Sequence, residues 1–167
     1  MAHIRYGCLN PNAKTVEYPV AASQYFRHDG PNFVYLDSSG HLTLVVTATT
    51  TIFGYAIVPK GGGAGTSPND YWLSSAIAGA DRIPVIVTDE NEDYICLADA
   101  LATAAQAGDE CDLLTDNDGT ACYVDIGTSS TDVLIIQGLA SADPYKIAGA
   151  ATNDVVVKIN PEFRQHD

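Results

Sequence analysis

The sequence predicts a mainly β protein, a small β-barrel or sandwich with one short helix and an extended N-terminal arm. Short runs rich in β-branched and aromatic residues recur along the chain, and turn-forming residues separate them. Only residues 97–107 have the Ala- and Leu-rich composition of a helix, with Gly108 placed to end it. The length of 167 residues suits one β-rich domain, 25–167, preceded by an arm, 1–24.

The N-terminal segment, residues 1–24, shows neither helical nor strand periodicity, and Pro11 and Pro19 interrupt regular pairing. An extended segment of this kind can add a strand to the exposed sheet edge of a neighbouring protein. We therefore expect the arm to act as an anchor. Residues 1–20 also lack the apolar core of a signal peptide, so we expect function without export. The predicted contact residues of the arm are Arg5, Tyr6, Lys14 and Tyr18.

The first half of the predicted domain contains three strand patterns, over 33–36, 41–47 and 52–58. The turn residues 37–40 connect the first two strands as a hairpin. Residues 59–70 contain four glycines and two prolines, a composition that predicts a flexible loop because it cannot sustain a strand ladder.

The second half contains more short strands. Residues 82–87 and 93–97 are expected to pair with each other around a turn at 89–92. A hairpin turn is expected at 116–119. The further predicted strands are 110–114, 121–126, 133–138 and 154–159.

The chain is strongly acidic, with 21 acidic and 8 basic side chains and a net charge of −13. This charge argues against nucleic acid as a direct partner, because phosphates would be repelled. Twelve acids lie in residues 81–125 against Arg82 alone, whereas the first 28 residues hold three basic side chains against Glu17. We expect an acidic surface facing water and a mildly basic arm. No apolar run approaches the length of a membrane helix, so no membrane partner is expected.

The four cysteines match no zinc-binding spacing. The predicted hairpin places Cys122 opposite Leu113 and not opposite Cys111, so free, partly buried thiols are expected. The remaining two are Cys8 and Cys96.

The motifs that might carry chemistry are each incomplete. The glycine-rich stretch 61–67 has no Lys before Thr66, as a phosphate-binding loop requires. The Asp-rich turn 116–120 resembles half a calcium loop, but aligning Gly119 on the loop glycine puts Leu114 at the first ligand position. No histidine has a partner at metal spacing. We therefore predict no catalytic, cofactor-binding or metal-binding residues and no enzymatic activity. A small hydrolase with a hidden acidic site is the minor alternative.

Three stretches of the C-terminal third, 108–113, 124–136 and 153–161, share one resemblance that covers roughly the last 60 residues. They resemble the head decoration (capsid cement) proteins of tailed bacteriophages. The resemblance implies a small β-rich structural protein without catalytic residues, assembled in the host cytoplasm. Such a protein sits on the capsid exterior, often as a homotrimer, and bridges major capsid proteins. The predicted trimer-interface residues are Tyr71, Trp72, Leu73 and Ile77, which follow the glycine loop and have no evident strand partner.

Another virion or surface β-module is the alternative interpretation, such as a head fibre, a tail component or a carbohydrate-binding domain. Aromatic side chains can form a platform on which sugars stack, although core and interface packing is the preferred explanation for such residues. The candidates are Tyr25, Tyr35, Tyr55, Tyr71 and Trp72.

Overall fold

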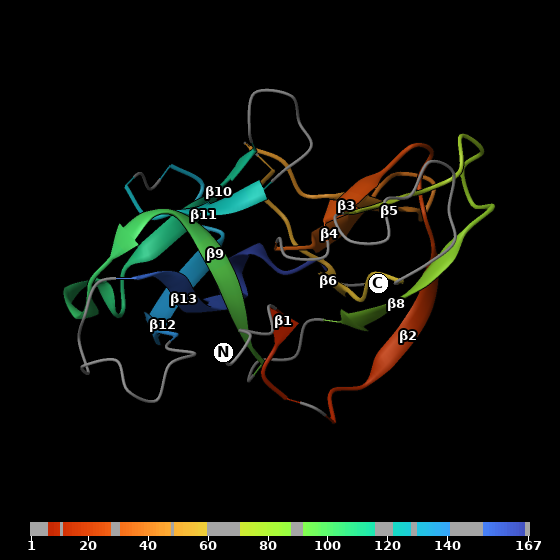
Figure 1. The fold of residues 1–167 in the computed structure, drawn as a ribbon. Helices are drawn as coiled ribbons and strands as arrows, with labels where there is room; N and C mark the ends of the chain where they lie inside the picture. Colours follow the sequence, from red (N-terminus) through yellow and green to blue (C-terminus); the bar gives the residue numbers. More distant parts are fainter. Residues whose placement is uncertain are drawn as a thin grey trace.

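The protein is mainly β and contains a closed five-stranded barrel with additional sheets (Figure 1). In this computed structural model, no helix in the described part of the chain reaches seven residues. The structure describes residues 7–10, 12–27, 31–47, 49–59, 71–87, 92–115, 122–127, 130–140 and 152–165. The predicted glycine-rich loop beyond residue 59 and the Asp-rich turn 116–120 lie outside these ranges.

Five strands of the C-terminal half form the barrel. Their order is β9-β11-β10-β12-β13, and β13 pairs with β9 to close the ring. The predicted hairpin between β10 and β11 is confirmed, with Leu113 opposite Val124. Because the ring is closed, the barrel has no continuous free sheet edge. The strands are β9 (Asp93–Ala102), β10 (Glu110–Thr115), β11 (Cys122–Asp125), β12 (Leu134–Leu139) and β13 (Thr152–Ile159).

The predicted helix over 97–107 is wrong, because this segment continues strand β9 and then forms a single 3-10 turn, Ala104–Gln106. Along β9, Tyr94, Cys96 and Ala98 are buried, and the residues between them are more exposed. This alternation has the period of a strand. Pairing with β13 on one side and with β1 and β11 on the other outweighs the weak helix preference of alanine.

A second sheet of five strands has the order β2-β8-β6-β4-β5. The predicted pairing of 82–87 with 93–97 is wrong: β8 lies between β2 and β6, whereas β9 belongs to the barrel. Both segments are strands, but sequence adjacency did not decide their partners. The strands are β2 (Thr15–Pro19), β4 (Phe33–Leu36), β5 (Leu42–Leu44), β6 (Gly54–Ala56) and β8 (Arg82–Val87).

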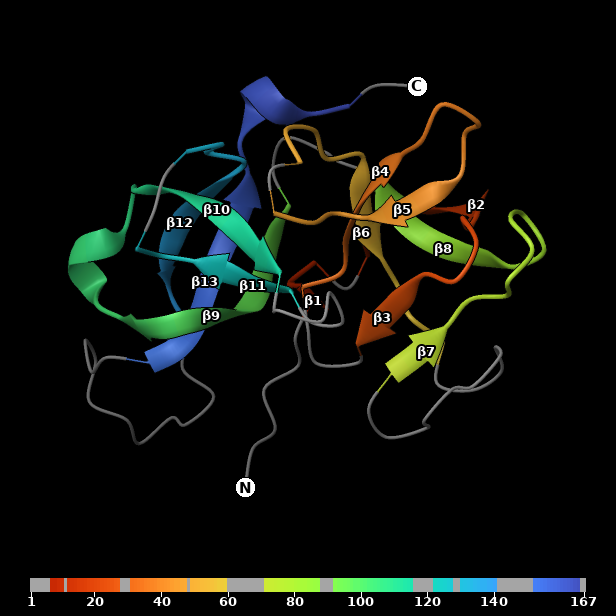
Figure 2. The same ribbon diagram turned by 90° about the horizontal axis from the view of Figure 1, so that it is seen from above.

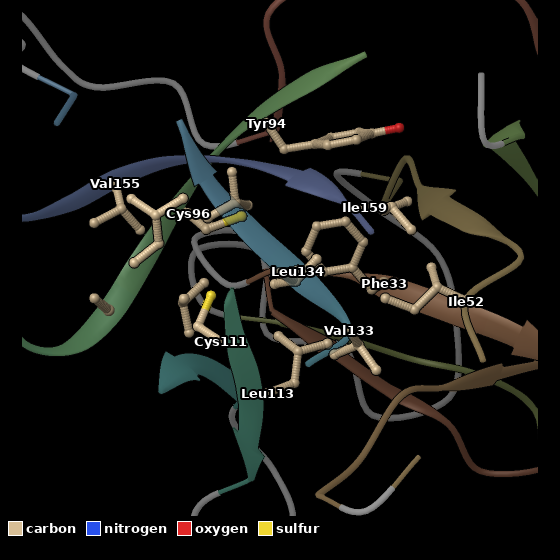
Figure 3. Packing of buried hydrophobic residues seen from close by; sticks show 14 of the residues in the cluster. Phe33, Ile52, Tyr94, Cys96, Cys111, Leu113, Val133, Leu134, Val155 and Ile159 are labelled. Atoms are coloured by element: carbon tan, nitrogen blue, oxygen red, sulfur yellow. The ribbon is translucent and has the colours of Figure 1, made fainter. Parts of the chain in front are cut away.

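The central strands of the second sheet are buried on both faces. On one face, Val34 and Val85 join a cluster of the sheet's own apolar residues. On the other face, Phe33 and Tyr55 belong to the cluster that fills the barrel, where both rings contact Tyr94 of β9. Figure 3 shows Phe33 reaching toward the barrel residues. The barrel and the second sheet therefore share a continuous core.

The predicted free arm is wrong in its described part, because these residues belong to the fold of their own chain. Strand β1 (Gly7–Cys8) pairs with β9, and β2 pairs with β8 over all five of its residues. Val20 is fully buried. The strand pattern was hidden because β2 is an edge strand whose first residues face solvent on both sides, so no apolar alternation marks it.

The chain beyond β2 closes the second sheet. Val20 forms a parallel bridge to Leu42 of β5, and the Ala21 N–H donates to the Leu42 carbonyl at 2.9 Å. Gln24 then accepts a hydrogen bond from the Leu44 N–H through Oε1 at 2.9 Å. Residues 20–24 thereby occupy the edge of β5, and a domain boundary at residue 24 would cut through this contact.

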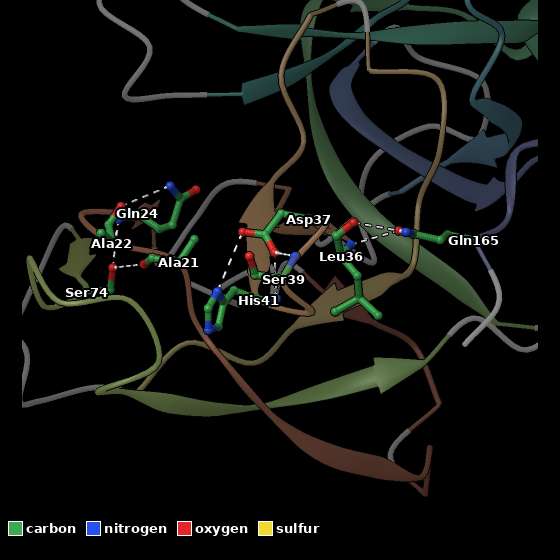
Figure 4. Close-up of polar contacts among 9 residues, drawn as sticks. All are labelled: Ala21, Ala22, Gln24, Leu36, Asp37, Ser39, His41, Ser74 and Gln165. Atoms are coloured by element: carbon green, nitrogen blue, oxygen red, sulfur yellow. Dashed lines mark hydrogen bonds and ion pairs between the residues drawn. The ribbon is translucent and has the colours of Figure 1, made fainter.

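The C-terminal segment ties the barrel to the second sheet. It leaves β13 and forms a parallel bridge between Arg164 and Ile52. The Gln165 side chain donates to the Leu36 carbonyl at 3.0 Å and accepts from the Leu36 N–H at 2.8 Å, as Figure 4 shows. One side chain thus completes the hydrogen bonding at the end of β4.

The cysteines whose side chains the structure describes are free, as predicted. Cys96 and Cys111 lie in the barrel core (Figure 3). Cys122 stands opposite Thr115 rather than opposite Leu113, because the hairpin is centred one residue later than predicted.

Candidate binding surface

The sequence predicts a basic arm and an acidic middle segment, but in the structure the difference in charge lies between the second sheet and the barrel. The second sheet with its described connections carries three acids and three bases, whereas the barrel carries nine acids and one lysine in the described residues. The acids of the barrel are Glu92, Asp93, Asp99, Asp109, Glu110, Asp112, Asp125, Asp132 and Asp154, and its lysine is Lys158. A partner that avoids an acidic surface would therefore bind the second sheet and its attachments.

A two-stranded ribbon lies beside the second sheet and is formed by β3 (Tyr25–Arg27) and β7 (Tyr71–Leu73) (Figure 2). Its inner face places Phe26 against Trp72, with ring centroids 5.8 Å apart, and both side chains are buried. Its outer face stacks Tyr25 on Tyr71 at 4.3 Å. Trp72 is thus part of the protomer's own core, and the prediction that it lines a trimer interface is wrong.

A loop after β7 presents the most exposed large apolar side chain in the described part of the chain. Ile77 is 71% exposed, and its neighbours Ala76 and Ala78 are exposed as well. We call residues 76–78 the apolar tip. It carries no charge.

Hydrogen bonds hold both ends of the apolar tip. The Ser75 N–H donates to the Asp81 carboxylate at 2.6 Å, and the Ile77 N–H donates to Ser75 Oγ at 3.1 Å. The Gly79 N–H donates to the Val20 carbonyl at 2.8 Å. Because Ile77 is presented on a fixed loop, binding through it would cost less conformational entropy than binding through a loose one.

The predicted arm contacts do not form one surface. Lys14 is exposed, but Tyr18 is half-buried and packs edge-on against Phe53 with ring centroids 4.9 Å apart. Arg5 and Tyr6 lie outside the described residues. Of the predicted interface residues, Tyr71, Leu73 and Ile77 remain accessible to a partner.

The aromatic residues considered for sugar stacking are separated by the fold. Tyr55 is buried between the barrel and the second sheet, and Trp72 lies inside the ribbon. Tyr35 packs against the barrel core. Only Tyr25 and Tyr71 share an accessible face, as a stacked pair. Their positions two residues apart across paired strands become visible only once the strand partners are known.

Asp112 is a buried carboxylate of the barrel with a structural role. It accepts hydrogen bonds from the Ser130 N–H and hydroxyl and from the Thr131 and Asp132 N–H groups, at 2.6 to 2.9 Å. Burial opposes its ionisation, but these hydrogen bonds, led by that of the Ser130 side chain, lower the pKa of Asp112 to about 2. Asp112 is therefore an ionised anchor for the loop before β12.

Cys8 is the one described thiol with some access to solvent. Its Sγ donates to Glu92 at 3.1 Å, and Glu92 also accepts from the Asn10 side chain at 2.8 Å. Desolvation and the hydrogen bond to Glu92 raise the pKa of Cys8 to about 11, so at neutral pH it is a protonated thiol and a poor nucleophile.

Among the described residues, no three His, Cys, Asp or Glu side chains gather in a way that could hold a metal ion. No helix in the described part of the chain has the length and apolar character needed to cross a membrane. Sequence reasoning named Ile77 but missed Gln24 and Gln165, whose polar side chains connect residues distant in sequence. It also missed Asp81, which holds the loop by accepting from the nearby Ser75 N–H. In comparisons with known proteins, the chain matches no protein-family model, no curated protein and no solved structure.

Proposed function

We propose that this chain is a non-enzymatic structural virion protein, a decoration protein that binds major capsid proteins on the outside of a phage head. The observation that carries the proposal is the unequal division of charge between the barrel and the second sheet. A protein attached to a particle needs one side for attachment and one side compatible with water. The resemblance of residues 108–113, 124–136 and 153–161 to capsid cement proteins adds the class of partner.

In this proposal the acidic barrel faces water and the side that carries the ribbon and the apolar tip faces the capsid. Like charges repel, so copies of a chain with net charge −13 approach each other best through their least charged parts. A homotrimer fits this rule and remains part of the proposal, with Ile77 at its contacts and the outer edge of β7 left to the capsid. Trp72 acts indirectly, by supporting the ribbon from beneath.

The test uses heads of the encoding phage assembled without this chain, to which the purified protein is added. We expect added density on the outer surface in cryo-electron microscopy, with the second sheet toward the shell. Ile77→Asp should reduce occupancy, whereas Leu101→Asp is the matched control, because Leu101 is 63% exposed on the barrel. Heads that show no added density would sink the proposal.

A carbohydrate-binding module is the second candidate, and the stacked Tyr25–Tyr71 pair on an accessible face favours it. Aromatic faces bind the apolar faces of sugars. Binding on a glycan array that is lost in Tyr71→Ala and kept in Lys14→Ala would support this candidate. A blank array for the wild-type chain would exclude it for the glycans tested.

A further inference from the structure

Most strand edges in the described part of the fold are closed or interrupted. The barrel strands pair in a ring. In β2, Glu17 lies opposite Pro84, which has no N–H and whose carbonyl accepts from Ile57 on the far side. Glu17 therefore directs its backbone groups outward, and its carbonyl accepts from the Arg82 side chain at 2.8 Å. Pro19 removes the next outward donor, so β2 offers no continuous row of donors and acceptors.

The two other edges near the ribbon are also occupied. At β5, the Leu42 carbonyl and the Leu44 N–H are bonded by Ala21 and Gln24. On β3, the Arg27 carbonyl accepts from the Asn32 side chain at 2.7 Å. These contacts leave little room for an added strand at either place.

Strand β7 is different. The Ser74 N–H donates to the Gln24 carbonyl at 2.9 Å, so Ser74 and, two residues earlier, Trp72 direct their backbone groups toward β3. Tyr71 and Leu73 consequently direct their N–H and C=O groups away from β3. Within the described part of the chain, these outward groups of Tyr71 and Leu73 have no hydrogen-bond partner. Both residues are only partly buried, and β3 is the one described strand that pairs with β7, so among the described residues the outer edge of β7 carries four unpaired backbone groups.

We propose that the outer edge of β7 accepts an extended segment of the capsid partner as an added strand. A row of alternating N–H and C=O groups is complemented by another extended backbone, which is the basis of recognition by strand addition. The inference rests on the proposed function and specifies its contact. It reverses the expectation from the sequence: this chain offers an acceptor edge, whereas its own N-terminal segment is used inside its fold.

Charge and side chains indicate the kind of segment that fits. The ribbon and the loop through residue 80 contain no acid among their described residues, although the chain as a whole is strongly acidic. A strand added at β7 would lie beside Leu73 and the Tyr71 ring, both partly exposed. The segment should therefore be extended and apolar at alternate positions, with neutral or acidic residues between them.

Leu73→Pro is the decisive variant. It removes an outward N–H and leaves the hydrogen bonds between Trp72 and β3 in place, a position where an edge strand tolerates proline. Leu73→Thr is the matched control, because it changes the side chain but keeps the N–H. We expect the affinity for heads lacking this chain to fall about tenfold in Leu73→Pro beyond any loss in Leu73→Thr. Circular dichroism and Trp72 fluorescence check that both variants fold.

Hydrogen exchange gives a second readout on the wild-type protein. The amides of Tyr71 and Leu73 should exchange more slowly on heads than in the free protein. Heads that bind Leu73→Pro and Leu73→Thr equally, without slowed exchange, overturn the inference alone. Heads that bind neither variant nor wild type overturn the proposed function and this inference with it. Exchange that slows in the free protein as its concentration rises identifies a second copy as the occupant, which overturns the capsid assignment.

Discussion

The barrel and the second sheet each contain five strands, but they are closed in different ways. The barrel closes by backbone pairing, with six residue pairs between β9 and β13 and one pair, Val124 with Ala98, between β11 and β9. The second sheet closes by a single bridge, Val20 to Leu42, together with the Gln24 side chain, which accepts from the Leu44 N–H of β5. In a ladder of several residue pairs, the loss of one hydrogen bond removes a small part of the pairing. A closure made by one bridge and one side chain depends on individual residues. Single substitutions at the closing contacts should therefore affect the second sheet more than the β9–β13 seam of the barrel.

The same two units differ in charge. The barrel tolerates its charge because seven of its nine described acids are exposed or partly exposed to water. The ribbon and the apolar tip beside the second sheet contain few charged residues. Trp72 is the single tryptophan of the chain and belongs to the second unit, so its fluorescence reports on that unit separately.

The largest expected effect is that of Gly54→Ala in the second sheet. A Cβ at Gly54 would stand 2.5 Å from the Ile86 carbonyl oxygen and 2.6 Å from Val85 Cγ1. Because one contact is backbone, β6 and β8 must separate, and we expect a loss of about 3 kcal/mol in the free energy of unfolding. Urea unfolding followed by Trp72 fluorescence measures it.

The matched control for this substitution is Gly138→Ala in the barrel, where a Cβ would meet nothing within 4 Å. Gly138 should tolerate alanine with little change in the urea midpoint. Equal losses in the two variants would contradict the view that close backbone approach at Gly54 determines the packing of β6 on β8.

Asp112→Ala measures the effect of a single substitution on the stability of the barrel. The substitution leaves the N–H groups of Ser130, Thr131 and Asp132 without their acceptor, and we expect a loss of about 2–3 kcal/mol. Urea unfolding followed by far-ultraviolet circular dichroism measures the loss at neutral pH. Ser130→Ala is the milder companion, because it removes the hydroxyl donor alone. A wild-type midpoint in Asp112→Ala would show that water replaces the carboxylate without cost.

The ionisation of Asp112 makes the stability of the fold depend on pH in a defined direction. The folded-state pKa of Asp112, about 2, lies below its value in the unfolded chain, about 4. The contribution of ionised Asp112 to stability is therefore present above about pH 4 and is lost as the pH falls toward 2. Asp112→Asn should flatten the stability profile in that window. An unchanged slope between pH 4 and pH 2 would place the acid sensitivity elsewhere.

The sequence predicted the class of fold and most strand positions because apolar alternation and turn residues are local signals. Phe33–Leu36 matches β4, and the β10–β11 hairpin was expected from the turn between its strands. Strand β9 was misread where alanines dominate, because a buried strand of small residues resembles a helix in composition. Residues 82–87 were a correctly predicted strand with a wrongly predicted partner, since pairing is not a local property.

The candidate surface could be predicted only in part. Ile77 was named because no strand pattern accounted for it, and it is exposed. Trp72 was misplaced because a large aromatic residue has the same sequence signal in a core and in an interface. The open edge of β7 depends on which backbone groups face β3, and Pro19 was read as a break in a free arm although it belongs to a paired strand.

The smallest expected effect sharpens the comparison most directly, because it concerns closure alone. Gln24→Ala removes the acceptor of the Leu44 N–H, and we expect a loss of about 1 kcal/mol in stability. Hydrogen exchange should show faster exchange at Leu44 with unchanged exchange along β9. Gln137→Ala is the control, because Gln137 is exposed on the barrel and its side chain makes a long local hydrogen bond, 3.4 Å to the Ile135 carbonyl. If Gln24→Ala leaves exchange at Leu44 unchanged, the Val20–Leu42 bridge is sufficient to close the second sheet, and residues 21–24 merely cover it.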